Sequence, residues 1–218
     1  MRVSESEFII DGLPQDAVKV ISFDGLLPGH ARDLWSVTAH RLDLRFAKTC
    51  LSLINAAEND TRRALWRAAI THYCKCFSQT NKKGGRKPLH PNNFLETGLP
   101  RDIHRWFMSL RNMNLMHDEN GWLQTLTGAV IAGPGKGYNI EKVLCTTVEG
   151  QSLTQENFGN MSLLIESALE WTNSEFERLC EELSKELERI PRETLLNQPN
   201  VTYRAPEADE VHSPRVSN

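Results

Sequence analysis

The segment TQENFGNMSLLIESALEWTNSEFERLCEELSKELER, residues 154–189, decides the fold class. Apolar side chains recur in it at steps of three or four residues, the spacing of one helix face. That face comprises Phe158, Met161, Ile165, Ala168, Trp171 or Thr172, Phe176, Leu179, Leu183 and Leu187. The start of the segment, Ser152-Leu153-Thr154-Gln155, resembles a capping box, and Pro191 ends the run. We therefore predict a long helix over about residues 154–189.

Three more helices are predicted upstream. Residues 31–55 carry a helical apolar pattern, and Asn59 or Asp60 can cap a second helix over about 61–77. A loop rich in Asn, Gly and Pro follows, and Pro100 suits the first turn of a third helix. Two β-prone runs within about 121–150 flank a turn cluster, which predicts a β-hairpin. The fold class is therefore mainly α, a bundle of four main helices with a small β-hairpin insert.

The two ends of the chain differ from this centre. Residues 1–29 hold several Gly and Pro breaks around one strand-like run at 17–21, which predicts an irregular N-terminal arm. Residues 30–190 make up the predicted helical domain. Residues 191–218 are polar, contain proline and lack aromatic density, so we expect a disordered tail.

The composition limits the classes of protein to which this chain can belong. The 218 residues suit one large domain, and a net charge of -3 argues against a basic coat over the whole surface. Any contact with RNA must therefore come from a local patch. No apolar run approaches a membrane span and the first residues do not resemble a signal peptide. With five cysteines, an odd number, we expect a cytoplasmic protein with reduced thiols and no membrane association.

The segment Leu110–Gly121 carries the clearest chemistry. It places Arg111, then Asn112, and then His117 at the end of the third predicted helix. A guanidinium is a fixed cationic fork for phosphate oxygens, and histidine gives and takes protons near neutral pH. On a helix, residues six apart differ by about 120° in rotation and by about 9 Å along the axis. A compact site therefore calls for two antiparallel copies, and Asn114, three residues from both, could join it.

This segment resembles the signature of the HEPN superfamily (higher eukaryotes and prokaryotes nucleotide-binding domains), an Arg, then Asn, Asp or His, and a His a few residues on. Trp66, the aromatic run 72–77 and the basic loop 81–87 fit the same resemblance, which covers about residues 35–190. It implies a homodimeric helical bundle that cuts RNA without a metal or other cofactor. Arg111 would hold the scissile phosphate, His117 would transfer a proton or position the 2′-hydroxyl, and Asn112 would orient Arg111 or touch the phosphate. The family further suggests a bacterial toxin or an anti-phage effector, restrained by an antitoxin or sensor protein.

Further RNA contacts are predicted around the signature. Lys82, Lys83, Arg86 and Lys87 form the densest basic cluster, which suits steering of phosphates and equally suits a solvated loop. His104 falls seven residues before Arg111, on nearly the same helix face, where it could extend the cleft or lie on the surface.

Two other patterns are weaker. Gly133-Pro134-Gly135-Lys136-Gly137 fails as a phosphate loop, because Gly137 stands where a P-loop needs Ser or Thr, and we predict a hairpin turn. Cys74 and Cys76 lack the second ligand pair of a zinc site, so we predict Cys76 and Tyr73 in the core.

Two rival functions stay open. The chain could be a non-catalytic HEPN-like bundle that binds RNA, a nucleotide or a protein partner. It could also be a helical adaptor in which Arg111 pairs with a nearby acid and His117 only caps helix carbonyls.

Overall fold

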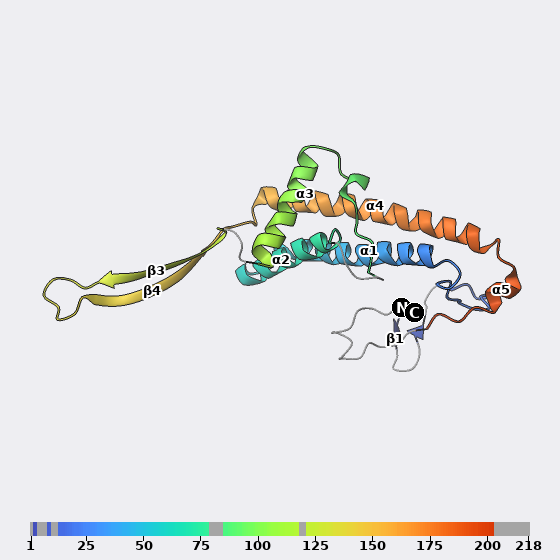
Figure 1. Cartoon of the computed structure of the whole chain (residues 1–218), viewed down its shortest axis with the longest axis horizontal. Helices are drawn as coiled ribbons and strands as arrows, with labels where there is room; N and C mark the ends of the chain where they lie inside the picture. The colour runs from blue at the N-terminus through green and yellow to red at the C-terminus, as the bar shows by residue number, and fades with distance from the viewer. Residues whose placement is uncertain (1, 4–7, 10–12, 79–84, 118–120, 203–218) are drawn as a thin grey trace. The chain divides into compact units, whose positions relative to one another are not determined.

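The computed structural model describes residues 2–3, 8–9, 13–78, 85–117 and 121–202, and the chain is mainly helical (Figure 1). The four long helices occupy the positions that the sequence predicts, so the mainly α fold class is confirmed. The helices are α1 (Pro28–Ile54), α2 (Asn59–Lys75), α3 (Leu99–Leu110), α4 (Gln155–Leu187) and the short α5 (Arg192–Leu196), with a 3-10 turn, η1 (Pro91–Asn93), before α3.

The predicted hairpin is also present. Strand β3 (Leu123–Ile131) pairs antiparallel with β4 (Ile140–Glu149), in a register that sets Leu123 opposite Glu149. The loop between the strands is a turn and not a phosphate cradle, because the ammonium group of Lys136 lies 2.6 Å from the carboxylate of Glu141. A second pair, β1 (Arg2–Val3) with β2 (Phe8–Ile9), falls within the arm that we predicted to be irregular.

The chain divides into two compact units. The central unit comprises residues 41–78 and 89–171, and the terminal unit comprises residues 1–40, 79–88 and 172–218. Each unit takes part of α1 and part of α4.

Within the terminal unit, the N-terminal arm pairs with the C-terminal tail. The amide of Ser22 donates to the carbonyl of Pro199 at 2.8 Å, and that of Val201 donates to Val20 at 3.2 Å. The ammonium group of Lys19 donates to two carbonyls of the tail. Residues 191–202 thus differ from the expected disordered tail, because the arm satisfies their backbone groups. Residues 203–218 lie outside the described part.

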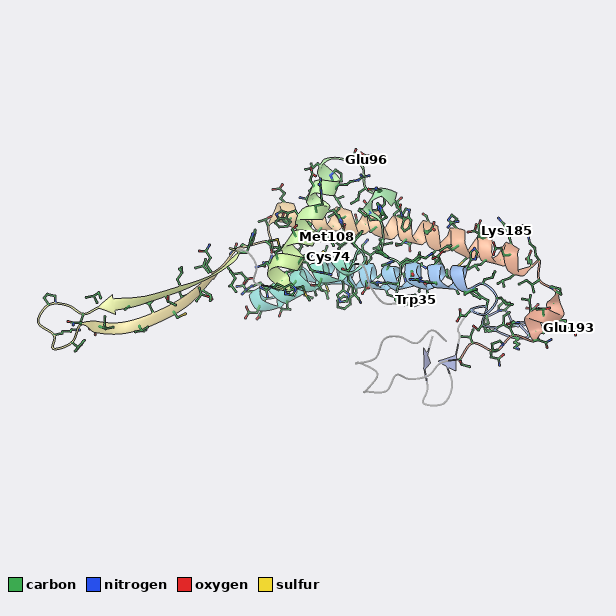
Figure 2. All side chains as sticks on the ribbon, viewed as in Figure 1. Trp35, Cys74, Glu96, Met108, Lys185 and Glu193 are labelled. Carbon is green, nitrogen blue, oxygen red and sulfur yellow. The ribbon has the colours of Figure 1, made fainter. Side chains whose placement is uncertain are left out.

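The central unit is organised around a buried apolar cluster from its helices. The ring of Phe107 on α3 is fully buried, with its centroid 6.0 Å from that of Trp66 on α2. Figure 2 labels Cys74 and Met108 where these two helices meet. Tyr73 and Cys76 are fully buried, which confirms their predicted place in the core. The other fully or nearly fully buried members are Leu44, Ala47, Cys50, Leu51, Ile54, Ala69, Ile70, Leu89, Leu95, Leu110, Met161, Leu164, Ile165, Ala168 and Leu169.

Local sequence sets where the helices begin. The hydroxyl of Thr154 accepts from the amide of Asn157 at 3.1 Å, the bond of an N-cap, at the start of α4. Pro100 lies in the first turn of α3, as predicted, after Gly98 with a φ of 88° that favours glycine. Helix α2 starts at Asn59, so Asn59 and Asp60 lie in its first turn and are not its caps.

The base of the hairpin is fixed to α2. The indole N–H of Trp66 donates to the hydroxyl of Ser152 at 3.0 Å, just after β4. The amide of Gly150 donates to the carbonyl of Trp122 at 2.7 Å, and a Cβ at position 150 would overlap the Trp122 ring. Glycine is therefore required where the hairpin joins the helices.

The Phe107 ring should be the largest single contributor to the α2–α3 contact. We expect Phe107→Ala to lower the free energy of unfolding by about 3–5 kcal/mol, because it removes apolar contacts and leaves a cavity. Leu163→Ala on α4 is the control, since Leu163 is 65% exposed and its truncation should cost less than about 0.5 kcal/mol. Urea unfolding followed by circular dichroism measures both, and equal losses would contradict this account of the core.

Candidate functional site

The signature closes α3 with a turn that is wider than an α-helix. Residues Arg111–Leu115 form a π-helical turn, η2, in which the amide of Met116 donates to the carbonyl of Arg111 at 3.0 Å. Such turns insert one extra residue into a helix and occur often at functional sites. The chain leaves this turn at His117, whose side chain is exposed.

His117 of the signature and Asn114 of the same segment line a pocket of about 450 Å³ in the central unit. Asn114 and His117 lie in its wall, together with Arg63 and Arg67 from α2 and Glu149 from the end of β4. Leu115, Met116 and Leu123 complete the lining. The pocket therefore combines an exposed imidazole, an amide and two guanidinium groups, which are the groups that bind a phosphodiester and move its protons.

Arg63 and Arg67 are the residues that the sequence analysis missed. Both guanidinium groups contact the carboxylate of Glu149, one at each oxygen, and both arginine side chains remain about half exposed. Their spacing of four residues places them on one helix face, a signal that could have been read. Glu149 could not have been found, because its place depends on how the hairpin joins the helices. Two cations against one carboxylate leave a net positive charge beside His117.

Arg111 does not line this pocket. Its guanidinium donates to the side-chain oxygen of Asn112 and to the hydroxyl of Ser78, each at 2.5 Å. Its Nε is buried and has no hydrogen-bond partner among the described residues. Arg111 is therefore held next to Ser78, just after the end of α2. The side-chain oxygen of Asn112 occupies an N–H group of the arginine that a ligand would otherwise use.

His104 lies in the core and not in the pocket. It is 6% exposed, and its Nδ1 lies 2.8 Å from the hydroxyl of Tyr73. Burial, with a contribution from Arg105, lowers the pKa of His104 to about 4, while burial raises the pKa of Tyr73 well above its usual value. The imidazole is therefore neutral at pH 7 and shares a hydrogen bond with the Tyr73 hydroxyl. His104 therefore lies neither in the cleft nor on the surface, the two positions that the sequence left open, because its side chain is buried in the core of the central unit.

The predicted basic loop is only partly described. Lys82 and Lys83 lie outside the described residues, and Arg86 and Lys87 belong to the terminal unit. There, the backbone carbonyl of Lys87 accepts from the His40 ring at 2.7 Å, and its side chain pairs with Asp33. Lys87 is thus engaged within its own unit, so its predicted contact with RNA would require breaking an ion pair.

A buried carboxylate stabilises the central unit on another side. Asp43 of α1 accepts from His72 at 2.8 Å and from Lys75 at 3.0 Å, both on α2. Because the Asp43 carboxylate is almost fully buried, its negative charge needs partners in place of water, and His72 and Lys75 contact it there. We assign these three residues to joining α1 and α2.

Within residues 13–78, 85–117 and 121–202, no three His, Cys, Asp or Glu side chains gather in a way that could hold a metal ion. Burial raises the pKa of the Cys74 thiol to about 12, against an opposing effect of Arg111. Cys74 is therefore an uncharged core side chain. None of the helices in the described residues is both long enough and apolar enough to cross a membrane.

No family model, no curated protein sequence and no solved structure matches the chain.

The buried His104 makes stability depend on pH. Its pKa in the folded chain lies below its ordinary value of 6.5, so the unfolded chain binds the proton more tightly. The stability of the wild type should be complete above about pH 6.5 and should fall toward pH 4. We expect His104→Gln, whose amide can still form a hydrogen bond with Tyr73 and cannot take up a proton, to lose less stability over this range.

Urea unfolding at several pH values between 7.5 and 4.5 measures this difference. His117→Gln is the control, because His117 is exposed and should keep the wild-type slope. Parallel curves for wild type and His104→Gln would show that His104 does not carry the effect.

Proposed function

We propose that the chain is a metal-independent endoribonuclease of HEPN type, and that the pocket at the end of α3 is its RNA site. The observation that carries this proposal is that His117 of the signature, with Asn114 of the same segment, shares one pocket with Arg63 and Arg67. A proton-transferring group and two phosphate-binding groups thus face the same space. The pocket lies beside the end of α3, in a chain whose net charge is -3.

The reaction that fits these groups is attack by the 2′-hydroxyl of RNA on the adjacent phosphorus. The bond from phosphorus to the 5′-oxygen breaks, which yields a cyclic phosphate and a 5′-hydroxyl. One group must take the proton of the 2′-hydroxyl and another must protonate the leaving oxygen. His117 can do one of these, while the arginines neutralise the charge that develops on the phosphate oxygens.

A second proton donor or acceptor is needed for a complete reaction. The HEPN resemblance provides one, since it implies a homodimer in which two signatures meet across a two-fold axis. The imidazole of the partner subunit would then act on the other oxygen. Single-stranded RNA or a tRNA loop would be the substrate, because its backbone can bend for in-line attack.

Binding of RNA would rearrange the pocket. A phosphate would compete with Glu149 for Arg63 and Arg67 because both anions need the same N–H groups. Arg111 would have to leave Ser78 to reach a phosphate in the pocket. Glu149 and Ser78 therefore hold the resting positions of three arginines.

Uncontrolled RNA cleavage is harmful to a cell. The biological role that we propose is therefore a toxin or an anti-phage effector, restrained by an antitoxin or a sensor protein. Growth arrest on expression, lost in His117→Ala and Arg111→Ala, is what this role requires.

A non-catalytic role in binding RNA or a nucleotide is the second candidate. The observation that favours it is the bonding of Arg111 to Asn112 and Ser78, away from the pocket wall. In this case Arg63 and Arg67 would bind phosphate but no cleavage would follow.

Cleavage should depend on His117. We expect purified protein to cut total RNA in EDTA and leave 5′-hydroxyl ends, and His117→Ala to be slower by about 10²–10⁴-fold because it loses proton transfer. His90→Ala is the matched control, since His90 is exposed and only accepts from the nearby amide of Asn92.

End mapping by sequencing distinguishes the outcomes, with thermal melting to show that each variant folds. Cuts that persist in His117→Ala would exclude it as the catalytic group. A folded wild type that binds RNA without cutting would favour the second candidate.

RNA binding should depend on the two arginines of α2. We expect Arg63→Ala with Arg67→Ala to weaken binding, because fewer phosphates are neutralised. The slope of log Kd against log salt should fall by about 0.7 for each phosphate that the variant no longer neutralises. Glu149→Gln should act in the opposite direction, because it frees both guanidinium groups.

Fluorescence anisotropy with a single-stranded RNA measures both effects. Arg105→Ala is the control, since Arg105 pairs with Asp102 on α3 and does not line the pocket. An equal loss of affinity in Arg105→Ala would indicate a nonspecific charge effect and contradict the assignment of the pocket.

A further inference from the structure

Strand β3 is an exposed edge without the features that usually protect one. All nine residues, Leu123–Ile131, are exposed, and none is charged or proline. Within the described residues, β3 pairs only with β4, so its other edge offers free backbone N–H and C=O groups. Natural proteins normally blunt such an edge with charge, proline or a covering element.

The two faces of the hairpin are also only partly polar. Leu126, Val130 and Ile131 of β3 are 48%, 41% and 71% exposed, and Val143 of β4 is 74% exposed. A two-stranded hairpin is marginal in water, and three or more strands with an apolar face are needed for stability. The hairpin therefore has both the edge and the side chains to become part of a larger sheet.

We propose that β3 pairs antiparallel with β3 of a second copy, which gives a four-stranded sheet in the order β4, β3, β3, β4. The strand is complementary to itself. Full overlap sets Thr127 opposite the partner's Thr127 and Leu123 opposite the partner's Ile131. The end pairs are apolar, Gln124 lies opposite Val130, and no charge enters the contact.

The register follows from symmetry. A two-fold axis perpendicular to the sheet leaves the upper and lower faces of the sheet unchanged. Each residue must therefore lie opposite a partner residue whose side chain points to the same face of the sheet. Thr127 lies at the centre of the nine residues and satisfies this rule. The Thr127 pair would then share a face with Cys145, which lies opposite Thr127 within each hairpin.

The other edge is a poorer match for a second copy. Strand β4 carries Glu141, Lys142 and Glu149, of which Glu141 pairs with Lys136 and Glu149 with the two arginines of α2. Pairing of β4 with itself would bring these charges into the contact, and like charges opposite one another are destabilising. The charge pattern therefore selects β3 as the edge that associates.

This interface differs from the signature contact that the HEPN resemblance implies. Leu123 lines the pocket, and full overlap separates the two Leu123 residues by eight positions, about 27 Å along the strands. The two pockets would remain apart in this pair. The β3 contact therefore does not depend on the ribonuclease proposal, and one can fail without the other.

Edge pairing of nine residues buries less surface than a standard interface, so we expect a dissociation constant on the order of micromolar. Sedimentation velocity over a range of concentrations measures it. Thr127→Lys should weaken the dimer by tenfold or more, because it places two ammonium groups together on the axis. Thr147→Lys adds the same charge on the same face of β4 and should leave the constant within about threefold.

Cross-linking tests the register directly. In a Cys145→Ser background, which removes the thiol facing position 127, Thr127→Cys should form a disulfide-linked dimer on oxidation. Thr147→Cys in the same background should not. A wild type that stays monomeric at high concentration would overturn the proposal and indicate a β3 edge free for another protein. A dimer that Thr127→Lys leaves unchanged would also overturn it, and would point to the signature helix.

Discussion

Burial of Phe107 against Trp66 is the contact on which the arrangement of the central unit depends. It sets α3 across α2, and so brings the end of α3, with His117, toward the face of α2 that carries Arg63 and Arg67. The same Trp66 donates to Ser152 and holds the exit of the hairpin, which places Glu149 between the two arginines. An apolar contact therefore positions a polar pocket. Burial of the two rings removes apolar surface from water, which stabilises the folded arrangement of α2 and α3.

Two histidines of the same region differ in burial, and this difference decides which of them a ligand can reach. His104 and His117 follow one another along α3 and its π-helical turn, yet the first is buried with Tyr73 and the second is exposed in the pocket. Desolvation lowers the pKa of His104 and keeps the ring neutral in its hydrogen bond with Tyr73. His117 keeps access to solvent and to any ligand in the pocket.

The hairpin contributes both to the pocket and to the proposed contact with a second copy. Its base supplies Leu123 and Glu149 to the pocket, while its length presents an uncharged edge. Glu149 both balances the arginines and ends the strand that avoids self-pairing. A protein that binds an anion in the pocket and a second copy along β3 would use the base of the hairpin for the first and the free edge of β3 for the second.

The sequence alone determined the helices, the hairpin and the candidate signature, because apolar periodicity, Pro100 and turn residues act over a few positions. It also placed Tyr73 and Cys76 in the core. Only the tertiary structure decided that the tail pairs with the N-terminal arm, that Arg111 turns to Ser78, and that Arg63, Arg67 and Glu149 join Asn114 and His117. These contacts link residues tens of positions apart, and packing of whole elements brings them together. Periodicity placed His104 and Arg111 on nearly one face, but the helix packing buried His104.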